Sequence, residues 1–195
     1  HFGPRGATVQ GDGSFTPPSA KPDKETGQTP KASAFWMYAT QVADVEVDLE
    51  TGRISVLRVV AAHDAGKIIN PNDAKGQIEG GVVQGVGATL LEEMVVEDGI
   101  VTNPSFAEYK IPSAMDIPEI VPVFVETHHT GGPYGAKGLG EPVLAPTSPA
   151  IANAIFNATG ARITSLPITP EKVLQALREN DSSQPTGGET IENQQ

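Results

Sequence analysis

Apolar β-branched residues are concentrated in two neighbouring stretches, which is typical of paired strands. Val42, Val45 and Val47 lie in the first stretch, and the second runs through "ISVLRVV" over residues 54–60. Between them, "DLETGR" places Gly52 where a hairpin turn needs a positive φ. The pattern therefore predicts an antiparallel hairpin.

Residues 72–96 follow a helical period instead. Ile78, Val82, Val86 and Leu90 recur at four-residue intervals, which places them on one slowly drifting face of a helix. The same stretch contains several glycines, and each costs about 1 kcal/mol of helix stability relative to alanine. We predict a helix whose bare backbone is used by a closely packed element or by a ligand.

The rest of the chain adds shorter elements. Asp98 and Gly99 form a predicted hairpin turn, and Pro122 in the strand "EIVPVFVET" predicts an edge position or a bulge. A helix is expected from Ser148 as its N-cap to a C-terminal Gly160, and a last helix is expected in "TPEKVLQALREN". Strands and helices are interspersed, so the fold class is α+β, with mixed sheets and packed helices.

Composition divides the chain into three parts. Residues 1–34 are rich in Gly, Pro, Lys and Thr and lack an apolar period, so we expect an extended arm or linker there, either disordered or lying on the surface of a partner. Residues 35–180 hold the predicted core. Residues 181–195, also without an apolar period, are expected to be a flexible tail.

Charge and cysteine content exclude several classes of function. The net charge of the 195-residue chain is −11, whereas a nucleic-acid binder needs a basic face. The chain has no cysteine, so it cannot itself form disulfides, thiolate zinc sites or iron–sulfur ligation. No apolar run approaches the ~20 residues that span a bilayer, and no signal peptide is visible. We therefore expect a cytoplasmic location.

The most unusual stretch is "GPYGAKGLGEP" at 132–142. It lacks the spacing of a phosphate loop, and neither "GVGATL" nor "GLGEPV" completes a dinucleotide fingerprint. Two interpretations of Glu141 stay open. It could be a carboxylate that favours the dipole of a following helix, or a base acting on a ligand that the glycine backbone approaches.

Two histidine-containing pairs offer weaker signals. His128 and His129 are adjacent, so on a strand their side chains would diverge, which is poor geometry for a metal. Two polar loop residues are the simpler interpretation. His63 and Asp64 at a strand end could be functional, but such a pair more often caps a turn. We expect no metal ligand from this chain.

Three segments together resemble a known family. "GQIEGGVVQGVGATLLEE", "PSFAEYKIPSAMDIPEI" and "GPYGAKGLGEP" resemble the C-terminal part of the molybdopterin-binding subunit of the xanthine dehydrogenase and aldehyde oxidase family. The resemblance covers roughly residues 35–180, and the last of these segments is its most specific part. It implies a portion of a molybdopterin-binding domain.

The resemblance also implies roles for particular residues. Glu141 would be the catalytic base beside the molybdenum, and Gln77 would contact the pterin. Gly80, Gly81, Lys137 and Gly138 would join it in binding the cofactor. The implied reaction hydroxylates an electron-poor carbon, with water as the oxygen source.

The family's subunit is far longer than this chain, so we expect an incomplete active site that shares the molybdenum cofactor with another molybdenum-subunit chain. Electrons would pass to [2Fe-2S] clusters and FAD on partner chains. An N-heteroaromatic such as a purine or nicotinate is the first expectation for the substrate, and an aldehyde is the second. The alternative from another class is a non-catalytic scaffold with the same fold.

Overall fold

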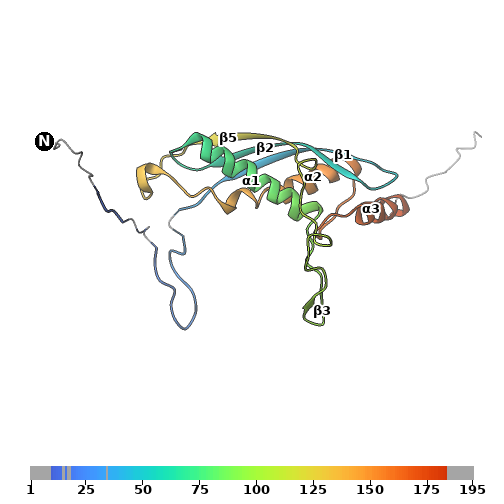
Figure 1. The fold of residues 1–195 in the computed structure, drawn as a ribbon, viewed down its shortest axis with the longest axis horizontal. Helices are drawn as coiled ribbons and strands as arrows, with labels where there is room; N and C mark the ends of the chain where they lie inside the picture. The colour runs from blue at the N-terminus through green and yellow to red at the C-terminus, as the bar shows by residue number, and fades with distance from the viewer. Residues whose placement is uncertain (1–9, 15, 17–18, 34, 184–195) are drawn as a thin grey trace, which may run out of the picture.

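A computed structural model describes residues 10–183, apart from 15, 17, 18 and 34. Its centre is a three-stranded sheet with the order β1-β2-β5 (Figure 1). Two helices pack against one face of this sheet, and a third follows near the C-terminal end of the described chain. The helices are α1 (Pro71–Leu90), α2 (Thr147–Thr159) and α3 (Pro170–Ser183). The α+β class is confirmed.

The first two strands form the predicted hairpin. β1 (Ala39–Val47) pairs antiparallel with β2 (Ile54–Asp64). Gly52 in the connecting turn has a φ of 73°, as the sequence predicted. β5 (Glu119–Val125) then joins β2 in parallel, so it is an edge strand, which is where its proline is tolerated.

The long helix is correct in type but shorter than predicted. Asn70 caps its start by accepting hydrogen bonds from the amides of Asn72 and Asp73. The helix ends at Leu90 because the amides of Leu91 and Glu92 both bond back to the Gly87 carbonyl, and the chain then turns away. The predicted extension to residue 96 is therefore wrong.

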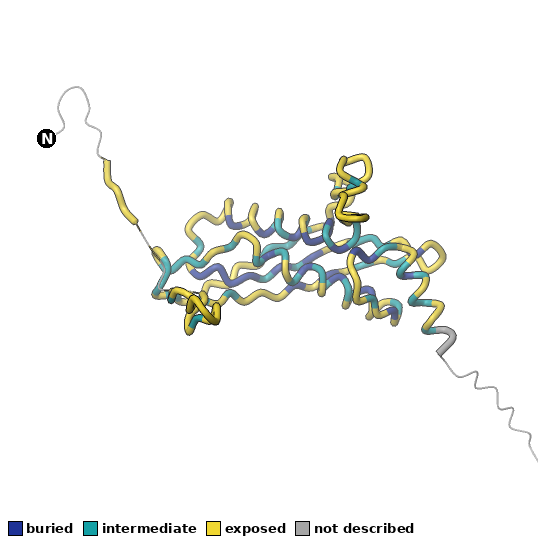
Figure 2. The backbone as a smooth tube through the Cα atoms, turned by 90° about the horizontal axis from the view of Figure 1, so that it is seen from below, coloured by how far each residue is buried: buried dark blue, intermediate teal, exposed yellow. Residues whose placement is uncertain are grey.

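A single core joins the sheet to the helices (Figure 2). The predicted face of α1 supplies Ile78, Val82 and Val86, all buried, while Leu90 is partly buried. Opposite them lie residues of β1, β2 and α2: Ala43, Val59, Ala61, Ile151 and Ile155. Among the described residues, no helix is both long and apolar enough to cross a membrane.

The start of α2 differs from the prediction. The helix begins at Thr147, so Ser148 is not its N-cap. The Ser148 hydroxyl instead accepts a hydrogen bond from Thr89, at 2.7 Å, which ties α2 to the end of α1. The C-terminal prediction is confirmed, since Gly160 has a φ of 74° and closes the helix.

Residues 92–117 form an arm that projects away from the sheet (Figure 1). Its hairpin pairs β3 (Val96–Glu97) with β4 (Ile100–Val101), and Asp98 and Gly99 make the predicted turn with φ values of 50° and 80°. The arm is exposed along most of its length (Figure 2).

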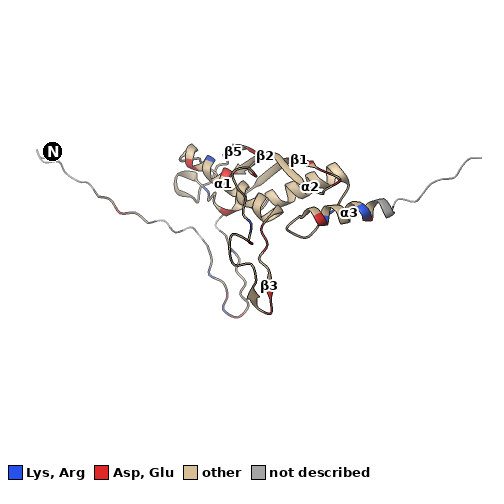
Figure 3. Cartoon of the chain, turned by 45° about the vertical axis from the view of Figure 1, so that its right-hand side comes forward, with Lys and Arg blue, Asp and Glu red and all other residues tan. Residues whose placement is uncertain are grey.

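Large apolar side chains remain uncovered on two surfaces. On the arm, Phe106 is 77% exposed and Met115 is 93% exposed. On the face of the sheet opposite the helices, Val42 is 59% exposed and Val123 is 40% exposed. Charged residues are scattered over several elements, including α1, α3 and the β3 hairpin (Figure 3).

The predicted arm and tail are only partly described. Residues 20–31 form a closed loop in which the Ala20 amide bonds to the Lys31 carbonyl and the Asp23 amide to that of Gln28. The predicted tail, residues 181–195, lies outside the described residues from position 184 onward, and α3 runs to Ser183.

Two glycines of α1 explain part of its unusual composition. A Cβ on Gly81 would lie 2.6 Å from the Cβ of Val143, and one on Gly85 would lie 2.4 Å from that of Thr147. These contacts bring α1 against the start of α2. A Cβ on Gly80, in contrast, would meet nothing within 4 Å among the described residues.

We therefore expect the neighbouring glycines to respond oppositely to alanine. Gly81→Ala should destabilise the chain by about 1–3 kcal/mol, since the added methyl forces Val143 to move. Gly80→Ala should stabilise it by up to about 1 kcal/mol through helix propensity. Denaturant unfolding of the two variants measures both. Equal effects of the two substitutions would contradict the packing described here.

Candidate functional site

The first half of the loop 132–142 is held against the segment that follows β2. Gly66 and Ala136 form an isolated antiparallel bridge. The Lys67 amide donates to the Gly135 carbonyl, and the Lys137 amide donates to the Ala65 carbonyl, each at 2.9 Å. Since a Cβ at Gly66 would lie 2.3 Å from the Gly135 carbonyl oxygen, this pairing requires a glycine there.

Lys137 anchors the loop through a buried ion pair. Its Nζ lies 2.5 Å from the carboxylate of Asp64, and the two side chains are 8% and 2% exposed. The same ammonium donates to the Thr127 hydroxyl at 2.9 Å and to the Trp36 carbonyl at 3.2 Å. All three N–H groups of Lys137 thus have partners, and a direct contact of this side chain with a cofactor would have to break one.

The surroundings of Asp64 favour its charged form. Burial alone would raise the pKa of this carboxyl, but the hydrogen bonds from Lys137, the Gly66 amide and Thr127 outweigh burial and lower the pKa to about 2. The bond to Gly66 is the turn cap expected from sequence. The ion pair with Lys137, 73 residues away, was not predicted.

A second buried network holds the other side of the loop. The Gln41 amide nitrogen donates to the Val143 carbonyl at 2.9 Å and lies 3.0 Å from Nε2 of His63. The Thr147 hydroxyl donates to the Gln41 amide oxygen at 2.8 Å. Burial lowers the pKa of His63, so its ring is neutral and its Nε2 accepts from Gln41.

The close contacts of α1 set its register against the loop. Gly81 meets Val143 and Gly85 meets Thr147, so α1 and the chain from 143 to 147 run in the same direction. Gln77 lies one helical turn before Gly81 on the same face. Glu141 lies just before Val143. The predicted site residues Gln77 and Glu141 therefore lie at the same end of this contact.

Both of these side chains are exposed at that end. Among the described residues, neither the Gln77 side chain nor the Glu141 side chain has a hydrogen-bond or ion-pair partner. Glu141 begins the single 3-10 turn η2 (Glu141–Val143), while α2 begins only at Thr147. Because the helix dipole acts within the first turn, the interpretation of Glu141 as a cap for α2 loses its support.

Glycines that neighbour Gln77 and Glu141 in the sequence leave bare backbone uncovered. A Cβ added to Gly76, Gly80 or Gly140 would meet nothing within 4 Å, and one on Gly138 would meet only the Phe35 ring at 4.0 Å. These glycines therefore have no packing reason within the described chain. A flat or bulky group that approaches the backbone closely fits there. The residues present thus fit the predicted cofactor.

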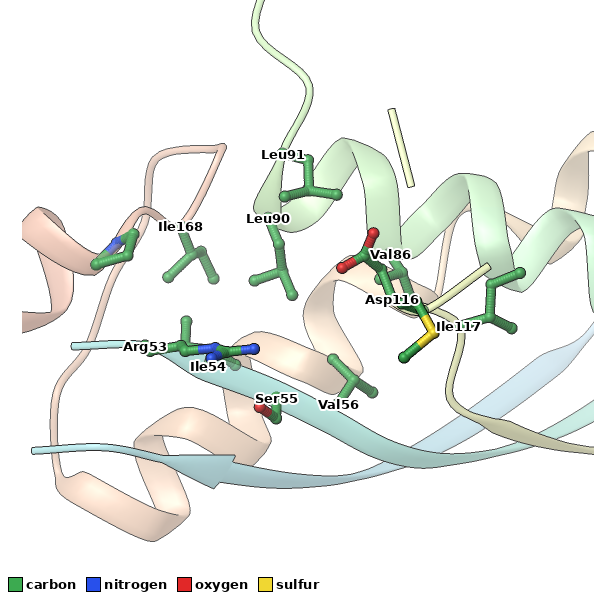
Figure 4. A pocket seen from close by; sticks show the side chains of 12 residues that line it. Arg53, Ile54, Ser55, Val56, Val86, Leu90, Leu91, Asp116, Ile117 and Ile168 are labelled. Carbon is green, nitrogen blue, oxygen red and sulfur yellow. The ribbon is translucent and has the colours of Figure 1, made fainter. Parts of the chain in front are cut away.

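Other candidate features lie elsewhere. The ring of His129 packs edge-on against the ring of Phe35, with 5.0 Å between the ring centroids, and His128 is exposed. Both observations are in keeping with the simpler interpretation of the pair as loop residues. The cavity in Figure 4, about 260 Å³, lies at the opposite end of α1 and is lined mainly by apolar residues such as Ile54, Val56 and Leu90. It is separate from the Glu141 loop.

Comparison with known proteins defines the class. The family model described as a molybdopterin cofactor-binding domain matches residues 3–118, which include Gln77, Gly80 and Gly81. The chain therefore belongs to the molybdopterin cofactor-binding domain family, as the resemblance implied.

Individual relatives extend the match to the loop. The chain is 38% identical over 140 residues to a xanthine dehydrogenase molybdenum-binding subunit of Escherichia coli O157:H7, covering 71% of this chain and 19% of that protein. It is 38% identical over 162 residues to an aldehyde oxidoreductase molybdenum-binding subunit of Escherichia coli K12, covering 82% and 22%. A match of that length must include residues 132–142.

The solved aldehyde oxidoreductase from Desulfovibrio gigas superposes with a TM-score of 0.67 at 38% identity, covering 73% of this chain and 15% of that one. The fold is therefore that of a portion of a molybdopterin-binding domain. The chain spans about a fifth of the length of the curated relatives it matches.

The ion pair predicts a specific acid sensitivity. The pKa of Asp64 is depressed from 3.8 to about 2, so its contribution to stability is present above pH 3.8 and is lost as the pH falls towards 2. The size of the loss is about 2 kcal/mol. Unfolding free energies of the native chain and of Asp64→Asn, measured from about pH 6 to about pH 2, should converge across that window. A constant difference would contradict the assignment.

Proposed function

We propose that this chain is part of the molybdenum-binding subunit of a molybdenum-dependent hydroxylase, in which Glu141 is the general base. The observation that carries the proposal is that the side chains of Glu141 and Gln77 lie at the same end of the contact between α1 and the chain from 143 to 147. Both are exposed and without partners among the described residues, next to glycines whose backbone no side chain covers. The family match supports the cofactor.

The residues that would hold the cofactor come from α1 and the loop. Gln77 can donate and accept hydrogen bonds with its amide, and Gly80 and Gly138 let the pterin approach their backbone. Gly81 and Lys137 were also predicted to contact the cofactor. Because Gly81 packs against Val143 and Lys137 pairs with Asp64, we propose that both act indirectly, by holding the residues around the site. When bound, the molybdenum cofactor supplies the two-electron oxidation of the substrate.

Glu141 would move a proton at this site. Its carboxylate is exposed and unpartnered within the described chain, so an oxygen of this group is available to accept a proton from a group on the incoming cofactor. The loop directly before it contributes backbone rather than side chains, which leaves room for the substrate. A scaffold without chemistry would have no need for this arrangement, so we place that alternative second.

The proposed reaction takes place at an electron-poor carbon of the substrate. We propose an N-heteroaromatic such as a purine or nicotinate, with an aldehyde as the second candidate. The similar proteins named above include a xanthine dehydrogenase subunit and aldehyde oxidoreductases, in keeping with both. A substrate screen with the whole complex separates the two classes.

The proposed enzyme requires further polypeptide. Two apolar surfaces of this chain are uncovered, the arm at 92–117 and the outer face of the sheet. We propose that the rest of the molybdenum subunit covers them and completes the pterin site. [2Fe-2S] clusters and FAD on partner chains would then carry electrons away.

This proposal predicts that residues 1–195 alone do not retain the cofactor. The open site supplies groups on one side only, so the pterin would stay exposed to water. Reconstitution of the isolated chain with the cofactor, followed by metal analysis, should give molybdenum far below one equivalent. Stoichiometric molybdenum together with turnover would show that the chain is complete as it stands.

Glu141→Gln tests the chemistry itself. The substitution keeps the shape of the side chain but removes its ability to take up a proton. In the fully loaded complex, we expect reduction by substrate to slow by a factor of at least ~10² to 10⁴, with molybdenum content unchanged. Single-turnover kinetics measures the rate.

Glu97→Gln is the matched control, since it removes an exposed carboxylate on the distant β3 hairpin. It should leave the rate unchanged. A normal reduction rate in loaded Glu141→Gln enzyme would remove Glu141 from the mechanism. A stability loss of only ~0.3–1 kcal/mol, with full activity, would support the helix-dipole interpretation instead.

A further inference from the structure

The last two residues of β2 hold the chain on both sides of Glu141. His63 and Asp64 are consecutive, and side chains alternate between the faces of a strand. His63 faces the helices, where it meets Gln41. Asp64 faces the other way and meets Lys137. One strand end therefore contacts the loop directly through Lys137 and also contacts Gln41, whose amide holds Val143 just after the loop.

The two attachment points bracket the carboxylate. Lys137 precedes Glu141 by four residues, and Val143, whose carbonyl accepts from Gln41, follows it by two. The chain between them includes Gly138 and Gly140, which bring no side-chain packing of their own. Leu139 in the same segment is partly buried against the core, so the two attachments hold the ends of the segment and Leu139 holds its middle.

We propose that Gln41 and Asp64 are positioning residues that fix the Glu141 carboxylate for catalysis, a role that rests on the proposed function. Gln41 acts through Val143 and the η2 turn, in which the Leu144 amide donates to the Glu141 carbonyl at 3.0 Å. Asp64 acts through Lys137. Neither side chain touches the cofactor.

Burial makes both attachments firm. Asp64 is 2% exposed and Gln41 is 9% exposed, so water does not compete for their hydrogen bonds. The amide of Gln41 uses both of its N–H groups and its oxygen, on His63, Val143 and Thr147. Its orientation is thereby fixed. A general base displaced by about 1 Å loses roughly 10²-fold in rate.

The test uses Gln41→Met and Asp64→Asn in the assembled, cofactor-loaded enzyme. Gln41→Met keeps the volume but removes all three hydrogen bonds, and Asp64→Asn removes the charge that Lys137 needs. Two variants at separate attachments keep the test valid if one fails to fold. Val173→Ala is the control, since it opens the core at α3, away from the loop.

We expect kcat to fall by about 10²-fold in either variant while KM and molybdenum content change little. Hydrogen exchange of the Lys137 and Leu144 amides, which donate to the Ala65 and Glu141 carbonyls, should accelerate on the order of tenfold, the size of one lost hydrogen bond to a charged group. Val173→Ala, compared at a similar loss of Tm, should change neither.

Exchange that stays as slow as in Val173→Ala would overturn the positioning role, whatever the rate does. Failure of the proposed function gives a different result. In that case exchange accelerates in both variants, yet kcat stays normal in them and in Glu141→Gln alike.

Discussion

A loop with so many glycines cannot hold its own shape, so the position of Glu141 depends on buried contacts at the two ends of the loop. Before Glu141, the ammonium of Lys137 is paired with Asp64 away from water. After it, Gln41 holds the Val143 carbonyl. The same constraint explains Gly81 and Gly85, because α1 must lie directly against the chain that leaves the loop.

Glycine has two different uses in this structure. Gly66, Gly81 and Gly85 are required by other parts of this chain, since a Cβ would collide with backbone or a side chain. Gly80 and Gly140 face open space. The first group builds the fold and the second group leaves room, which is what a site for a large planar cofactor requires.

Most of the fold could be predicted from local patterns. The hairpin turn at Gly52, the apolar face of α1 and the end of α2 at Gly160 each depend on residues close in sequence, and each is confirmed. The end of α1 and the start of α2 were wrong. The start of α2 involves a contact between distant segments, because the hydroxyl of Ser148 bonds to Thr89 rather than capping its own helix. The end of α1 depends on local bonds of the Leu91 and Glu92 amides to the Gly87 carbonyl, which leave no clear pattern in the sequence.

The candidate site could likewise be predicted from the sequence only in part. Glu141 and Gln77 are predicted through a family resemblance, and the structure brings them to one end of a helix contact. The contacts of Asp64 and Gln41 were not predicted, because an ion pair across 73 residues and an amide hydrogen bond across 102 leave no local pattern. The one available signal was His63 and Asp64 at a strand end, which we had interpreted as a turn cap.

An experimental structure of the assembled, cofactor-loaded subunit tests the central claim most directly. The account predicts a Glu141 carboxylate oxygen within about 2.6–3.2 Å of an atom of the bound cofactor or of an intervening water. Lys137 would still be paired with Asp64, and Val143 would still be bonded to Gln41. A Glu141 side chain turned away from the cofactor, or a Lys137 released from Asp64 to bind the pterin, would contradict it.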